Sequence, residues 1–150
     1  MDNNEEEEEE EEEEVPMHPS DLRDMESHAR ILHMLGDWEG AAFAFARAAR
    51  HHRIAGRMAE LTRCVLGSCE GLRVANRPDD VLEGLRAVAK ILLSNMAYKE
   101  AQDVADYSRR IYNLDPERFA RAAGVERFIG AACREPWRRA NGISVAAVPK

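Results

Sequence analysis

The sequence lacks a long hydrophobic run, a signal peptide and a disulfide framework. No stretch approaches the roughly 18 uninterrupted apolar residues that a membrane-spanning helix needs. The first residues are acidic, whereas a signal peptide begins with basic residues and continues with an apolar segment. The chain has three cysteines, an odd number that does not favour a set of structural disulfides. These absences predict a cytoplasmic protein without a transmembrane segment.

Signatures of catalysis and of metal binding are also missing. There is no phosphate-binding loop, no GxGxxG and no GxSxG. Cys64 and Cys69 are five residues apart, whereas metal pairs prefer shorter or i, i+4 spacings, and no cluster supplies four ligands. We therefore predict that these two cysteines and Cys133 are buried small residues. The sequence predicts no enzyme, no metal and no cofactor.

His51 and His52 lie at the predicted C-terminal end of a helix. The helix dipole favours a positively charged imidazole there. We expect the two side chains to cap the helix, and a pH-sensing role is the alternative.

The charge is distributed unevenly along the chain. Residues 5–14 are ten consecutive glutamates, and with Asp2 they account for 11 of the 28 acidic residues. The other 17 acidic residues and all 21 lysines and arginines lie in residues 15–150. This part of the chain therefore has a net charge of +4, although the whole chain carries −7. Adjacent like charges repel, and Pro16 and Pro19 disfavour helix. We expect a disordered acidic tail over 1–20, a helical-repeat domain over 21–135 and a flexible tail over 136–150.

Apolar residues in the domain recur at spacings of three and four, and runs of β-branched residues are absent, which predicts an all-α fold. The expected helices are 21–35, 37–54, 57–75, 78–95, 97–114 and 116 to about 134. We expect Ser20 or Asp21 to cap the first helix and Pro136 to stop the last. Short connections make neighbouring helices antiparallel. The prediction is a right-handed solenoid of helical hairpins, of the tetratricopeptide-like (TPR-like) type, with about six helices.

An internal repeat supports this architecture. Residues 29–32 (ARIL) match 89–92 (AKIL), and 38–41 (WEGA) match 98–101 (YKEA), at an offset of 60. Helix starts are mostly about 20 residues apart, so a hairpin takes about 40 residues, more than the ~34 of a standard tetratricopeptide unit. Gly67 and Gly71, four residues apart, predict close packing against a neighbouring hairpin.

Four segments carry a resemblance to a known family: 37–45 (DWEGAAFAF), 48–52 (AARHH), 75–80 (ANRPDD) and 85–88 (LRAV). In these segments the chain resembles the soluble NSF-attachment proteins, all-helical adaptors that hold SNARE bundles for the ATPase NSF. The resemblance implies an adaptor in vesicle fusion that holds a helical bundle on a concave face. No binding residue is transferred, since Met96-Ala97-Tyr98 replaces the typical Gly-Arg-Phe turn and Asp103 replaces a lysine.

Arginine dominates the basic residues, with 18 arginines against 3 lysines. Because arginine pairs bidentately with carboxylates and phosphates, we predict an acidic partner, and the resemblance implies that this is a helical protein bundle such as a SNARE bundle. The predicted partner-binding residues are Arg47, Arg50, Arg53, Arg57, Arg86, Lys90, Arg109 and Arg110. A phospholipid surface and a salt-bridged face without a partner are the alternatives, and the small body charge disfavours nucleic acid.

Two further alternatives stay open. The glutamate tract either keeps the chain soluble or folds back over the arginine-rich face, in which case its removal raises affinity for acidic partners. The protein is either an attachment-protein-like adaptor or another helical-repeat binder, such as a tetratricopeptide-type chaperone of a bacterial secretion system. A charged groove would favour the adaptor, and an apolar groove the chaperone.

Overall fold

The structure is a computed structural model that describes residues 17–140, with side chains up to Arg134. It contains α1 (Pro19–Met34), α2 (Trp38–Ile54), α3 (Met58–Val74), α4 (Pro78–Ser94), α5 (Tyr98–Leu114) and α6 (Ala122–Ala140). Over these residues there is no strand, which confirms the predicted all-α class. None of the helices in this part of the chain is long and apolar enough to cross a membrane.

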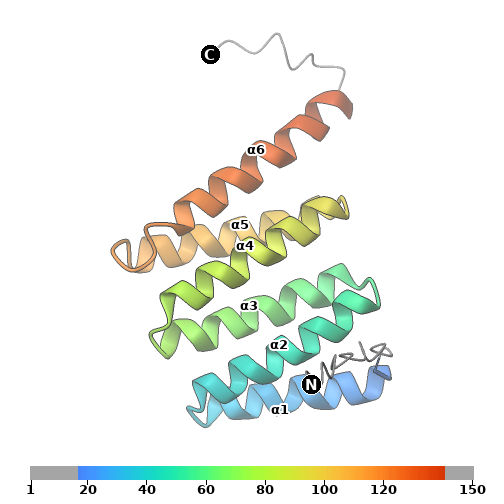
Figure 1. The fold of residues 1–150 in the computed structure, drawn as a ribbon, viewed down its shortest axis with the longest axis vertical. Helices are drawn as coiled ribbons and strands as arrows, with labels where there is room; N and C mark the ends of the chain where they lie inside the picture. Colours follow the sequence, from blue (N-terminus) through green and yellow to red (C-terminus); the bar gives the residue numbers. More distant parts are fainter. Residues whose placement is uncertain (1–16, 141–150) are drawn as a thin grey trace, which may run out of the picture.

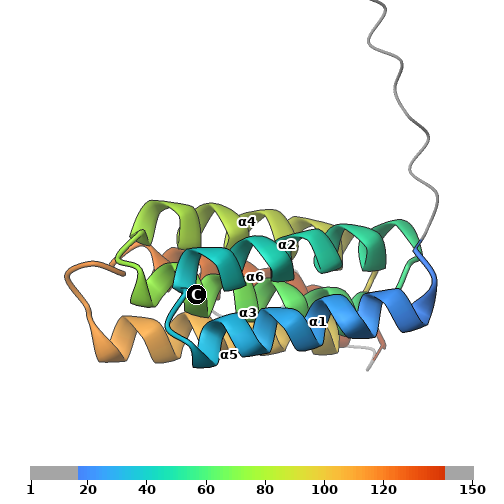
Figure 2. The ribbon, with the colours of Figure 1, turned by 90° about the horizontal axis from the view of Figure 1, so that it is seen from below.

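The helices stack in chain order as three antiparallel hairpins, α1–α2, α3–α4 and α5–α6 (Figure 1). Seen from below, α2 and α4 lie in one layer and α1, α3 and α5 in another (Figure 2). Each helix packs against the next, and α6 contacts both α4 and α5. The described chain is therefore a solenoid of helical hairpins, as predicted.

The first four helix junctions share one backbone conformation. The residues with positive φ are Gly36 (81°), Gly56 (72°), Asn76 (59°) and Met96 (55°), each 20 residues after the last. At the first junction the N–H of Asp37 donates to the carbonyl of Leu32 at 3.0 Å, and equivalent bonds close the other three. This is the Schellman ending, in which a left-handed residue reverses the chain and satisfies helix carbonyls.

The core repeats with the same period. The residue three places after each start of α2 to α5 is buried, with at most 2% of its surface exposed: Ala41, Leu61, Val81 and Ala101. Small residues then let α2 and α3 approach closely. A Cβ added at Gly71 would lie 2.7 Å from the carbonyl oxygen of Trp38, and one at Gly67 would lie 3.1 Å from the Phe45 ring. The close packing predicted for these glycines is confirmed.

The first helix starts earlier than predicted. It begins at Pro19, because proline suits the first turn of a helix and the ring of His18 accepts a hydrogen bond from the Ser20 N–H at 3.2 Å. The cap is therefore His18, and the expectation of Ser20 or Asp21 was wrong. The predicted disordered tail overlaps α1 at residues 19–20, and its glutamate tract lies outside the described residues.

The last helix differs from its prediction at both ends. Asp115 accepts a hydrogen bond from the Arg118 N–H at 3.2 Å, like a cap, but residues 116–121 form turns that bury Phe119, and α6 begins at Ala122. The helix also continues past Pro136, which was expected to stop it. Proline removes only its own N–H bond, so later residues can still bond to the preceding turn. Residues 141–150 of the predicted flexible tail lie outside the described part.

The left-handed junctions predict opposite effects of two substitutions. Met96 is 73% exposed and, unlike glycine, is strained at φ 55°, so Met96→Gly should stabilise the protein by about 0.5 kcal/mol. A Cβ at Gly56 meets nothing within 4 Å, so Gly56→Ala tests the backbone alone and should destabilise by about 1 kcal/mol. Urea unfolding followed by circular dichroism measures both changes in the free energy of unfolding. Changes of the same sign would contradict left-handed backbone conformations at these two positions.

Candidate functional site

An open groove runs between α4 and α6. Its first cavity, of about 320 Å³, is lined by Arg86, Ala89, Lys90, Arg121, Gly124, Val125 and Phe128. A cavity of about 450 Å³ shares its three cations and extends to Asp79 and Glu83. A separate cavity of about 400 Å³ shares only Lys90 with these two and lies against the α2–α3 junction, where Arg53 and Met58 line it. We call the first two cavities, which share Arg86, Lys90 and Arg121, the basic groove.

Helix geometry places the cations together. Arg86 and Lys90 are four residues apart on α4 and so project from the same side. Arg121 reaches the groove from the turn just before α6. Within the described chain these three side chains form no ion pair, hydrogen bond or ring contact. The groove thus holds three cations without an ion pair and the two carboxylates of Asp79 and Glu83, a net charge of +1, beside Val125 and a Phe128 side chain that is 52% exposed.

The structure brings together only part of the predicted partner-binding set. Arg86 and Lys90 line the basic groove, whereas Arg53 lines the separate cavity at the α2–α3 junction. Arg47 and Arg50 are exposed on α2, where the Arg47 guanidinium lies 6.0 Å from the Phe43 ring centroid.

The remaining members of the set lie elsewhere. Arg57 occupies the N-cap position of α3, where its side chain makes no capping hydrogen bond. Arg109 and Arg110 are on α5, in the other layer, where Arg109 donates to Glu126 at 2.8 Å and Arg110 lies 5.0 Å from the Tyr107 ring centroid. The prediction did not include Arg121 or Phe128, which the α5–α6 turn and α6 bring to the groove.

Tyr107 belongs to a polar bridge between α3 and α5. Its hydroxyl donates to Glu70 at 2.8 Å, and Arg73 donates to the same carboxylate at 3.0 Å. The hydrogen bond from Arg73 lowers the pKa of Glu70, burial raises it and the Tyr107 bond lowers it, so the pKa lies below its ordinary value. Burial raises the pKa of Tyr107, so its hydroxyl remains a donor.

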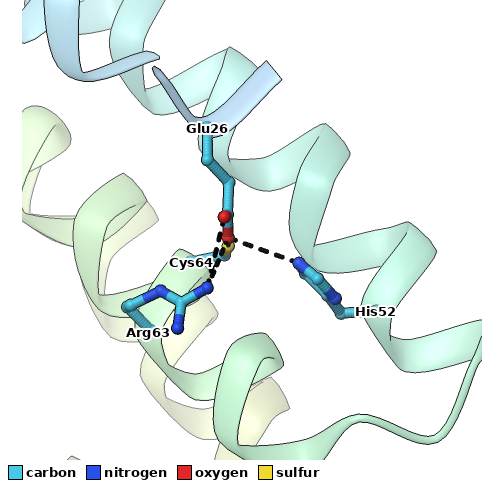
Figure 3. Close-up of polar contacts among 4 residues, drawn as sticks. All are labelled: Glu26, His52, Arg63 and Cys64. Carbon is cyan, nitrogen blue, oxygen red and sulfur yellow. Dashed lines mark hydrogen bonds and ion pairs between the residues drawn. The ribbon is translucent and has the colours of Figure 1, made fainter. Parts of the chain in front are cut away.

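A buried polar cluster joins the first three helices (Figure 3). Glu26 of α1 accepts from Cys64 Sγ at 2.7 Å and from Arg63 Nη2 at 2.9 Å, both on α3. His52 Nε2 of α2 lies 3.3 Å from the same oxygen, Oε1. Glu26 and His52 are each 4% exposed and Cys64 is fully buried. The donor atoms of Glu26, His52 and Cys64 lie within 4.8 Å of one another.

The cluster holds one negative charge in the core. Burial raises the pKa of Glu26, but hydrogen bonds from Cys64 and Arg63, the Arg63 charge and the His52 bond together hold the pKa below its ordinary value. Burial and the neighbouring carboxylate raise the pKa of the Cys64 thiol, which keeps its proton. Among the described residues, His52 Nδ1 has no hydrogen-bond partner although it is buried.

These contacts correct the prediction for His52 and add a polar contact to the burial predicted for Cys64. His52 does not cap α2, because its ring turns into the core toward Glu26. Cys64 and Cys69 are buried as predicted, and Cys133 partly so, but Cys64 contacts a carboxylate, whereas Cys69 lies near the Val81 carbonyl. The 20-residue repeat carries a signal that was overlooked: His52 occupies the position that leucine holds at 32, 72 and 92.

No family model, curated protein or solved structure matches this chain. The resemblance to NSF-attachment proteins therefore stays a prediction.

The Glu70 bridge predicts a pH-dependent stability. The pKa of Glu70 in the folded protein lies below its ordinary value, so its ionised form stabilises the fold above the ordinary pKa, and this contribution is lost as pH falls through the folded pKa. Glu70→Gln should cost about 1 kcal/mol at neutral pH, a modest value because the carboxylate is partly exposed. The difference from wild type should shrink below about pH 4.

Urea unfolding across pH checks this prediction, with Asp103→Asn as the control. Asp103 is exposed near the same bridge on α5, and its replacement should leave stability almost unchanged. An undiminished Glu70→Gln difference at low pH would contradict the role of the carboxylate charge.

Proposed function

We propose that this protein is a non-enzymatic scaffold that binds an acidic, helical segment of a partner protein in the basic groove. One observation carries the proposal: Arg86, Lys90 and Arg121 line an open cavity and form no ion pair or hydrogen bond within the described chain. Five arginines elsewhere pair with carboxylates instead: Arg63, Arg73, Arg77, Arg109 and Arg118. Cations left unpaired around a concavity favour an acidic ligand.

The groove also offers apolar contact. Val125 and the exposed ring of Phe128 line the same cavity as the cations. An amphipathic helix with carboxylates along one edge and apolar residues beside them would satisfy both features. Arginine-carboxylate pairs would fix its register, and burial of Phe128 would supply contact area.

The specific form of the proposal is an adaptor that resembles an NSF-attachment protein and handles SNARE bundles in vesicle fusion. The resemblance of residues 37–45 and 75–80 and the positive charge of the groove support it. Cys64, Cys69 and Cys133 are free, which fits a reducing compartment such as the cytoplasm.

The alternative is a tetratricopeptide-type chaperone that holds an extended apolar segment. Its support is the apolar part of the groove, where Ala89, Val125 and Phe128 meet. An apolar segment held by such a chaperone would depend on these contacts more than on the cations. The two functions therefore predict that charge reversal in the groove weakens binding to different extents.

Charge reversal in the groove tests the proposal. Arg86→Glu/Lys90→Glu should weaken binding of a purified, assembled SNARE bundle at least tenfold, because two attractive contacts become repulsive. Fluorescence anisotropy at several salt concentrations measures the affinity.

Removal of residues 1–14 should strengthen binding if the glutamate tract competes for the groove.

The control is Arg23→Glu/Lys99→Glu, which changes the net charge equally at exposed positions of α1 and α5. If both variants lose the same affinity for the bundle, net charge alone explains the effect, which would contradict binding in the basic groove. If the bundle does not bind but an extended apolar peptide does, independently of charge reversal, the chaperone alternative is supported instead.

A further inference from the structure

The buried cluster of Glu26, His52 and Cys64 has no role in the proposed binding of a partner, since the basic groove lies between α4 and α6. We propose that this cluster is a zinc site in which Glu26 Oε1, His52 Nε2 and Cys64 Sγ bind one Zn²⁺ ion. Carboxylate oxygen, imidazole nitrogen and thiolate sulfur are the three ligand types that protein zinc sites use. The proposal replaces our prediction from the sequence that the chain holds no metal.

The three donors already converge from three helices. Zinc ligands at about 2.0–2.1 Å and tetrahedral angles place a nitrogen and an oxygen about 3.3 Å apart. His52 Nε2 and Glu26 Oε1 are 3.3 Å apart here. Cys64 Sγ lies 2.7 Å from Oε1, so this pair must open by about 0.8 Å to reach the separation of zinc-bound sulfur and oxygen.

The charges of the cluster also suit a divalent cation. Zinc binds the thiolate, and the displaced proton leaves to solvent, so Cys64 and Glu26 together supply two negative charges for the ion. Arg63 remains as an additional positive charge, which its half-exposed side chain keeps in contact with water. Its Nη2 lies 2.9 Å from Glu26 Oε1, the oxygen that the ion would use, and 3.2 Å from Oε2, so the guanidinium must shift to Oε2 when the ion binds. Arg63 can therefore orient the carboxylate, as partners of metal ligands commonly do.

An ion at this position would join α1, the terminal helix of the described solenoid, to α2 and α3. Three protein ligands leave the fourth position of a tetrahedral ion to a water molecule. Because the cluster is nearly inaccessible to solvent, we expect binding to stabilise the N-terminal end of the solenoid rather than to supply a reactive centre.

Metal binding by the reduced, full-length chain tests the proposal. After treatment with a chelator, wild type should bind one equivalent of added Zn²⁺ in titration calorimetry and melt at a higher temperature. Co²⁺ used as a probe should give a thiolate charge-transfer band and the visible bands of a tetrahedral site. Cys64→Ser should remove the charge-transfer band and weaken Zn²⁺ binding at least about 100-fold.

Cys69→Ser is the matched control, because Cys69 is equally buried on α3 but lies outside the cluster. It should keep the band and the affinity. A folded wild type that gives no cobalt charge-transfer band or no stoichiometric zinc binding overturns the proposal, as does an unchanged band in Cys64→Ser. If Cys64→Ser does not fold, a Cys69→Ala/Cys133→Ala chain replaces it: Zn²⁺ should then slow labelling of the remaining thiol, and unchanged labelling overturns the proposal.

Discussion

The structure depends on a left-handed residue placed at the end of each of the first four helices. At Gly36, Gly56, Asn76 and Met96 the chain reverses within three residues, and the same backbone hydrogen bond closes each junction. Because α2 to α5 each contain 17 residues, every junction returns the chain in the same register. Equivalent positions are then buried every 20 residues, and the helices sort into two layers (Figure 2).

The candidate sites arise where this regular pattern is interrupted. After α5 the connection is longer, Phe119 packs into the core, and α6 runs at an angle to α5 (Figure 1). The basic groove lies on the side of α6 that faces α4. In the first three helices a histidine replaces the leucine of the repeat at position 52, and Glu26 and Cys64 meet it in the core. One interruption therefore leaves an open surface and the other a buried polar centre.

The sequence predicted most of the fold because its signals are local. Apolar spacing placed five helices within about two residues of their ends, and the glycines at 67 and 71 indicated close packing correctly. Local spacing could not predict contacts between residues that are distant in the sequence. The approach of Glu26 to Cys64 joins residues 38 apart, and the separation of Arg109 from Arg86 follows from the layers. The beginning of α6 was predicted too early because Asp115-Pro116 resembles a helix start. In the structure residues 116–121 form turns that bury Phe119, and the helix begins after them.

Photo-crosslinking can show whether a partner helix occupies the basic groove. A benzoylphenylalanine placed at Phe128 would report contact inside the groove, and the same group at Tyr112 would report contact on α5. Both side chains are exposed, so the two positions are comparable. With an assembled SNARE bundle bound, a partner helix in the basic groove predicts a crosslink from position 128 and none from position 112. A crosslink from position 112 alone, or equal crosslinking from both, would contradict it.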